Sequence, residues 1–148
     1  MSTLSEKLQD KDAGGVYFLD TEATIEELHR LVASIGFQFF YIDGKRISDK
    51  RSFLKKIAEA MHFPSYYGEN WDAFEECITD LGWLSASGYV LLYDHFDRFS
   101  TKKPGEWKIA FDILHSAAEH WKREGVPMYI LLRGNTSAVT GLPILTLK

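Results

Sequence analysis

Apolar residues along the chain form two kinds of pattern, which alternate from one end to the other. Four largely apolar runs, rich in aromatic and β-branched side chains, lie at residues 16–19, 37–42, 89–93 and 128–132. Runs of this length and composition predict strands. A strand that is apolar on both faces is typical of a sheet buried between two layers, so the runs indicate a covered sheet.

Between these runs, apolar residues recur at intervals of three and four, which predicts helices. Asp20 or Thr21 can cap the first helix, and Ser48 or Asp49 can cap a second that continues to Met61. The apolar positions of the first helix, before the terminating glycine Gly36, are Ile25, Leu28, Val32 and Ile35. Both segments therefore have one face suited to packing on a sheet.

A loop over residues 63–70 precedes a third predicted helix, which begins at Trp71 with Asn70 as its cap. Pro64 resists helix at the residue before it, and Gly68 permits backbone angles that other residues avoid. The two faces of this helix are chemically opposite, with Trp71, Phe74, Ile78 and Leu81 on one and Asp72, Glu76 and Asp80 on another.

A long helix over residues 107–123 precedes the last run, so strands and helices alternate along most of the chain. This order predicts an α/β domain with a mainly parallel sheet and right-handed crossovers. We expect one domain over residues 14–134, with polar tails at residues 1–13 and 135–148. The second tail could instead be an added edge strand or a partner-binding segment.

The size and composition of the chain limit the kinds of protein to which it can belong. With 148 residues it is long enough for one ordinary domain. A formal charge of −4 gives no general reason to bind nucleic acid or an anionic membrane, and favours a basic partner. The single cysteine, Cys77, permits no internal disulfide. With no secretory signal and no long apolar span, these features predict a soluble, cytoplasmic protein.

Acidic residues are concentrated in the middle of the chain, where residues 57–97 hold eight acids and no lysine or arginine. Six of them lie in or beside the predicted 63–70 loop and its flanking helices: Glu59, Glu69, Asp72, Glu75, Glu76 and Asp80. Like charges four apart on a helix each cost about 0.2 to 0.5 kcal/mol. The face is either a solvated surface that aids solubility or a surface that binds a cationic partner.

Enzyme chemistry has little support in these residues. Glu75 and Glu76 are adjacent in a helix and point about 100° apart, so they cannot flank one bond. His115 and His120 lack a metal-binding pattern, and Cys77 faces inward, where burial and carboxylates would raise its pKa. The sequence also lacks a GxSxG elbow, a P-loop and a GxGxxG turn. We therefore expect neither catalysis, nor a metal, nor a cofactor.

The segment Tyr-Tyr-Gly-Glu-Asn-Trp-Asp-Ala at residues 66–73, followed by Glu76-Cys77, resembles the barstar family, which inhibits barnase-type ribonucleases. The similarity extends over residues 38–133 and includes the Phe-Tyr-Ile-Asp-Gly strand and turn at 40–44. Residues 14–36 then read as an added N-terminal β-α unit. The resemblance implies a barstar-like α/β fold, with a small parallel sheet flanked by helices.

The resemblance also implies a function in which an acidic loop and helix plug the active site of a basic ribonuclease or ribonuclease-like toxin. Carboxylates on a rigid helix can occupy a cleft built for phosphates. By position, Tyr66 would stack in the cleft, Gly68 and Asn70 would make loop contacts, and Asp72 and Glu76 would pair with basic side chains. The implied partner-binding set is Tyr66, Tyr67, Gly68, Asn70, Asp72, Glu75, Glu76 and Thr79.

Three positions differ from the family pattern. Glu76 stands where an aspartate is expected, Glu75 where an aromatic residue is familiar, and His120 near an expected acidic contact. These differences keep open a second interpretation, a non-inhibitory interaction or regulatory module that binds another basic protein. The oligomeric state and the identity of the partner are left undetermined.

Overall fold

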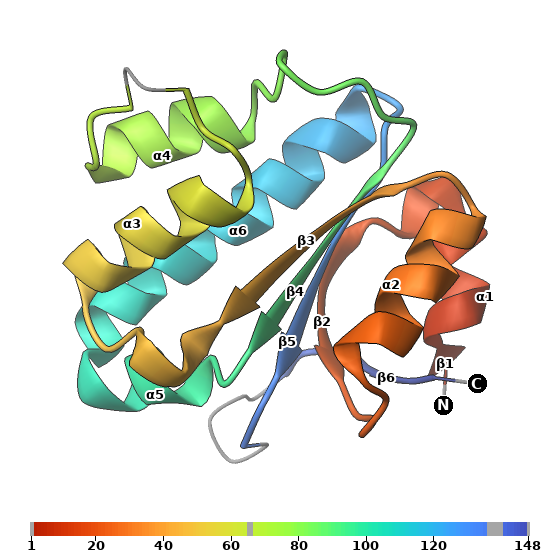
Figure 1. Ribbon diagram of the computed structural model, residues 1–148, viewed down its shortest axis with the longest axis horizontal. Coiled ribbons are helices and arrows are strands. Elements are labelled where there is room, and N and C mark those ends of the chain that lie inside the picture. The colour runs from red at the N-terminus through yellow and green to blue at the C-terminus, as the bar shows by residue number, and fades with distance from the viewer. Residues whose placement is uncertain (1, 65–66, 136–140, 148) are drawn as a thin grey trace.

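A computed structural model describes residues 2–64, 67–135 and 141–147 (Figure 1). Its centre is one six-stranded sheet in which every described strand pair is parallel. In sheet order the strands are β1 (Ser2–Thr3), β6 (Ile144–Thr146), β2 (Gly15–Leu19), β5 (Met128–Arg133), β4 (Tyr89–Asp94) and β3 (Gln38–Asp43). The α/β class predicted from the sequence is confirmed.

Helices cover both faces of the sheet (Figure 1). The helices α1 (Leu4–Leu8) and α2 (Ile25–Ser34) lie on one side. On the other side lie α3 (Lys50–Ala60), α4 (Trp71–Ile78), α5 (Asp97–Lys102) and α6 (Pro104–Arg123). Each face has its own apolar core, and all six residues of strand β4 are buried between the two. Among the described residues, no helix has the length and apolar character needed to span a bilayer.

Two caps fall where the sequence predicts them. Asp49 caps α3 by accepting the backbone N–H of Ser52 at 2.9 Å, and Asn70 caps α4. The cap of α2 is Thr24, not Asp20 or Thr21. Thr24 is the favoured cap because it forms a reciprocal capping box with Glu27, three residues later.

The N-terminal end contains structure that the sequence patterns did not predict, and at the C-terminal end the alternative of an added strand holds, although the strand lies inside the sheet and not at its edge. Residues 2–8, expected as part of a polar tail, form β1 and α1, and their Leu4 and Leu8 are buried. Strand β6, within the expected tail at residues 135–148, pairs with both β1 and β2. The short helix α5 was also not anticipated, and α6 begins three residues earlier than predicted.

An ion pair between buried Asp94 and half-buried Arg133 joins the carboxyl ends of the neighbouring strands β4 and β5. The Arg133 guanidinium donates to both carboxylate oxygens of Asp94, through Nε at 2.6 Å and Nη2 at 2.9 Å. It also donates to the carbonyl oxygen of Ala23 at 2.7 Å, which ties the start of the α2 region to the sheet. Tyr41 donates to the same carboxylate at 3.2 Å. This arrangement satisfies a buried charge with several hydrogen bonds.

Candidate functional site

The Asn70 side chain and the backbone conformation of Glu69 shape the loop before α4. The Asn70 side chain accepts the backbone N–H of Ala73 at 2.8 Å, and its amide donates to the Gly68 carbonyl at 3.4 Å. The left-handed backbone angle falls on Glu69, with φ of 50°, and not on Gly68, where the sequence suggested it. A Cβ at Gly68 would lie 3.1 Å from the Asn70 amide nitrogen, so that glycine serves a close approach.

The inner face of α4 fixes the helix to the core. Phe74, Cys77 and Ile78 are buried, and Phe74 makes an edge contact with Phe53 at 5.3 Å between ring centroids. At the end of α4, the Trp121 indole of α6 donates to the Ile78 carbonyl at 2.9 Å. The helix is therefore held on a rigid base, which keeps its outer side chains in fixed positions.

The outer side of this loop and helix is acidic and open to solvent. None of its acids forms an ion pair with another described residue. The exposed carboxylates, here called the acidic surface, belong to Glu69, Asp72, Glu75, Glu76 and Asp80. Half-buried Thr79 lies at its edge and donates to the Glu75 carbonyl at 2.7 Å. The structure thus places Asp72, Glu75, Glu76 and Thr79 on one continuous segment.

Of the two tyrosines in the loop, the structure describes Tyr67. Tyr66 lies outside the described residues. Tyr67 is half-buried with its ring 5.1 Å from that of Phe63, and its hydroxyl is buried without a hydrogen-bond partner among the described residues. Burial, followed by the nearby Cys77 and Glu69, raises the pKa of this phenol. Tyr67 therefore packs beneath the loop and supports it, although the resemblance places this residue in the partner-binding set.

A cavity of about 90 Å³ opens beside Tyr67 and is lined by Gly68, Ala73, Glu76, Cys77 and Asp80. Cys77 is buried, as the sequence predicted, and burial together with the carboxylates of Glu76 and Asp80 raises the pKa of its thiol. Asp80 was not in the predicted binding set. Its spacing of four from Glu76 was the signal that could have placed it there.

The end of α6 lies beside the end of α4. His120 is half-buried and its ring meets that of Trp121 edge-on at 5.3 Å. The neighbouring Glu119 forms long ion pairs with His115 and Lys122, each at 4.0 Å. In the part of the chain that the structure describes, no group of three or more histidine, cysteine or acidic residues could hold a metal ion.

A protein-family model described as Barstar (barnase inhibitor) matches residues 37–133. The chain belongs to the barstar family. The matched segment runs from β3 to the end of β5 and includes the whole acidic surface, while β1, α1, β2, α2 and β6 lie outside it. The family description suggests a barnase-inhibitor-like role and a ribonuclease as the kind of partner. A comparison with curated proteins gives no match.

Among solved structures, the fold is similar to that of Cdc6p from Pyrobaculum aerophilum, with 13% sequence identity and a TM-score of 0.52. The similarity covers 97% of this chain and 44% of the Cdc6p chain, so this chain spans less than half of that protein. Unlike the family match, the similarity includes the N-terminal and C-terminal strands. At this level of identity it shows a shared fold alone.

Proposed function

We propose that this barstar-family chain is an inhibitor or immunity protein that blocks the active site of a basic ribonuclease or ribonuclease-like toxin. The observation that carries the proposal is the acidic surface itself. Its five carboxylates are exposed and unpaired among the described residues, on α4 and the segments directly before and after it, and α4 is held to the core. Like charges along α4 repel one another, and a cationic partner would relieve this repulsion.

The physical basis of the proposed inhibition is that carboxylates of this chain would replace the phosphates of the substrate. A ribonuclease cleft holds phosphates with basic side chains, and fixed carboxylates can take those places without being cleaved. Asp72 and Glu76, four residues apart and both exposed, would form the central pairs. Glu75 would add a carboxylate beside them.

The loop supplies the remaining contacts. Gly68 and Asn70 would meet the enzyme through backbone and amide groups, and Tyr66 would stack in the cleft. Tyr67, which lines the cavity together with Glu76, would hold the loop in place, while Thr79 would border the contact. A basic side chain of the enzyme that enters this cavity would donate hydrogen bonds to the carboxylates of both Glu76 and Asp80.

The proposal is tested by capture from lysate and secretions of the source cell, followed by mass spectrometry and an assay of RNA cleavage in the eluate. Wild type is compared with Asp72→Ala/Glu76→Ala and with a control, Asp20→Ala/Glu22→Ala. The control removes two exposed acids near the start of α2 and so matches the change in net charge. Inhibition of purified barnase by the same three proteins is measured in parallel.

We expect wild type and the control to capture a basic protein whose ribonuclease activity appears on elution, and the Asp72→Ala/Glu76→Ala variant to lose it. Equal capture of proteins without nuclease activity by all three forms would contradict inhibition and favour an interaction module. Loss of binding only in the control would place the interface near α2. Circular dichroism of each variant checks that the fold is retained.

A further inference from the structure

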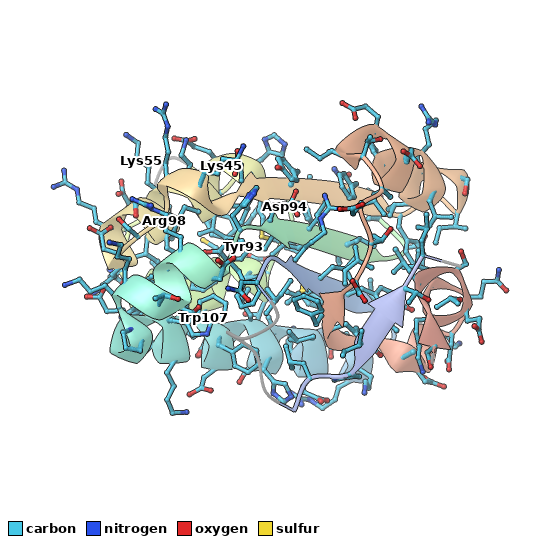
Figure 2. All side chains as sticks on the ribbon, turned by 90° about the horizontal axis from the view of Figure 1, so that it is seen from below. Lys45, Lys55, Tyr93, Asp94, Arg98 and Trp107 are labelled. Atoms are coloured by element: carbon cyan, nitrogen blue, oxygen red, sulfur yellow. The ribbon has the colours of Figure 1, made fainter. Side chains whose placement is uncertain are left out.

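A second charged surface of opposite sign lies across α3 from the acidic surface. Its cations come from η2 (Gly44–Arg46), α3, α5 and the residue after α5. The basic surface consists of Lys45, Arg46, Lys50, Arg51, Lys55, Arg98, Lys102 and Lys103. Figure 2 shows Lys45, Lys55 and Arg98 at the same end of the molecule. All are exposed except Lys50, which is half-buried.

None of these cations forms a salt bridge with a described residue. Asp49 interacts with two of them, since its pKa is lowered first by hydrogen bonds from Ser52 and further by Lys103 and Arg51. Lys50 places its ammonium 5.4 Å from the centre of the Trp71 ring. The charge of the surface is therefore available to an external anion.

Four acidic side chains within this region accept hydrogen bonds from backbone N–H groups. Asp43 accepts the N–H of Lys45 at 3.0 Å, and Asp97 accepts that of Asn135 at 3.2 Å. Glu106 accepts the N–H of Lys50 at 2.7 Å, and Asp49 caps α3. Asp43 also lies 3.3 Å from His95. Four acids are thus held in place by the fold, while eight cations extend around them.

The composition of the basic surface distinguishes between kinds of anionic partner. Protein interfaces are depleted of lysine at their centres and use aromatic or aliphatic anchors. Five of these eight cations are lysines. The large apolar residues exposed in the described chain are Ile35, Ile109 and Ile144, none of which lies on η2, α3 or α5. A surface of long cations without an anchor fits phosphates rather than a protein core.

We infer that the basic surface binds the phosphate backbone of a nucleic acid without regard to base sequence. The described surface offers no exposed aromatic ring for base stacking, so the contacts are to phosphates. The net charge of −4 had argued against such binding, but the fold separates the charges. Figure 1 shows α4 on one side of α3 and α5 on the other. This inference does not depend on the proposed inhibition.

The test is fluorescence anisotropy with a labelled 20-nucleotide single-stranded RNA of mixed sequence, over a series of salt concentrations. Wild type is compared with Lys45→Gln/Arg98→Gln/Lys102→Gln. The matched control is Lys11→Gln/Arg30→Gln/Arg123→Gln, which removes three exposed cations elsewhere with the same change in charge. The same titrations use single-stranded DNA of that sequence and poly-glutamate, and sedimentation velocity reports self-association.

We expect RNA binding at low salt that falls at least tenfold in the first variant and is unchanged in the control. The slope of log affinity against log salt should fall by about 2, because each lost phosphate contact removes about 0.7. DNA should bind within a few-fold of RNA, and Asp72→Ala/Glu76→Ala should still bind. No RNA binding at low salt, equal loss in both triple variants, tighter binding of poly-glutamate, or charge-dependent self-association instead of RNA binding would overturn the inference.

Discussion

At the scale of single residues, the buried tyrosine hydroxyls fall into two groups. Those of Tyr17 and Tyr129 donate to backbone carbonyl oxygens of Ala13 and Asp10. Those of Tyr67 and Tyr93 are buried with no partner among the described residues. A buried polar group without a hydrogen bond costs about 1 to 3 kcal/mol, so the first group stabilises the fold and the second does not.

Substitution of one tyrosine from each group should therefore have opposite results. We expect Tyr67→Phe to leave the free energy of unfolding unchanged or raise it by about 1 kcal/mol, because an unpaired hydroxyl is removed. Tyr129→Phe should lower it by about 1 kcal/mol, because the 2.6 Å bond to Asp10 is lost. Urea unfolding of both variants is the measurement. A larger loss in Tyr67→Phe than in Tyr129→Phe would contradict the assignment.

At the scale of elements, the start of α3 depends on one carboxylate. Hydrogen bonds from the backbone and side chain of Ser52 hold the pKa of Asp49 below its ordinary value of 3.8. The folded state therefore favours the ionised carboxyl. The ionised Asp49 carboxyl therefore stabilises the fold at a pH above its pKa in the unfolded chain. This contribution is lost as the pH falls through its lower pKa in the folded state.

Asp49→Ala should therefore destabilise the protein by about 1 kcal/mol at pH 7, with a smaller deficit as the pH falls below about 4. The control is Asp49→Asn, which retains a capping oxygen but carries no charge. It should lose less at pH 7 than the alanine variant. The measurement is urea unfolding of the three proteins between pH 7 and pH 3. A deficit that stays constant over this range would show that ionisation of Asp49 does not contribute.

In α4, binding and stability should respond in opposite directions to the same change. Glu76 lies four residues from both Asp72 and Asp80, so Glu76→Gln should raise the free energy of unfolding by about 0.2 to 0.5 kcal/mol. The same change should weaken binding of a captured ribonuclease. The control Glu59→Gln removes an acid paired with Lys56 at 3.8 Å and should bring no such gain. Reduced stability in Glu76→Gln would contradict the repulsion argument.

The elements that the sequence predicted are those with a long periodic pattern or a distinct cap. α3 and α4 were found because Asp49 and Asn70 precede clear apolar stripes. The positions of acids in the acidic surface were predicted from the same spacing. Short elements gave no such signal, since α5 has six residues and one buried side chain, Phe99. The supporting role of Tyr67 could not be predicted, because burial of its hydroxyl depends on Phe63 and α4 packing in three dimensions.

At the scale of the whole molecule, a modest net charge conceals two separate surfaces. The acidic surface lies on and beside α4, and the basic surface extends from α3 to η2 and α5. Local charge steers association more than the net charge does, and salt screens it over about 8 to 10 Å. The association rate constant of a captured ribonuclease should therefore fall as salt rises. A rate constant independent of salt in stopped-flow measurements would contradict steering by the acidic surface.

The two ends of the chain meet at one edge of the sheet, where β1 pairs with β6 and β6 with β2. Leu4 and Leu8 lie four residues apart in an otherwise polar segment, too short a pattern to predict a helix. Their burial arises only once β6 and β2 supply a surface. The core on this face of the sheet includes both leucines and Leu145 of β6.

Leu4→Ala should therefore lower the free energy of unfolding by about 2 to 5 kcal/mol, as expected when a fully buried leucine is truncated. The control is Lys11→Ala, an exposed residue nearby, which should change stability by less than about 0.5 kcal/mol. Urea unfolding monitored by tryptophan fluorescence measures both. Because the four tryptophans, Trp71, Trp83, Trp107 and Trp121, all belong to the opposite core, a parallel far-ultraviolet circular dichroism curve shows whether both faces unfold together. Coincident curves with a shifted midpoint would make the N-terminal segment part of one cooperative unit, whereas an unshifted midpoint would make it the separate tail that its composition suggested.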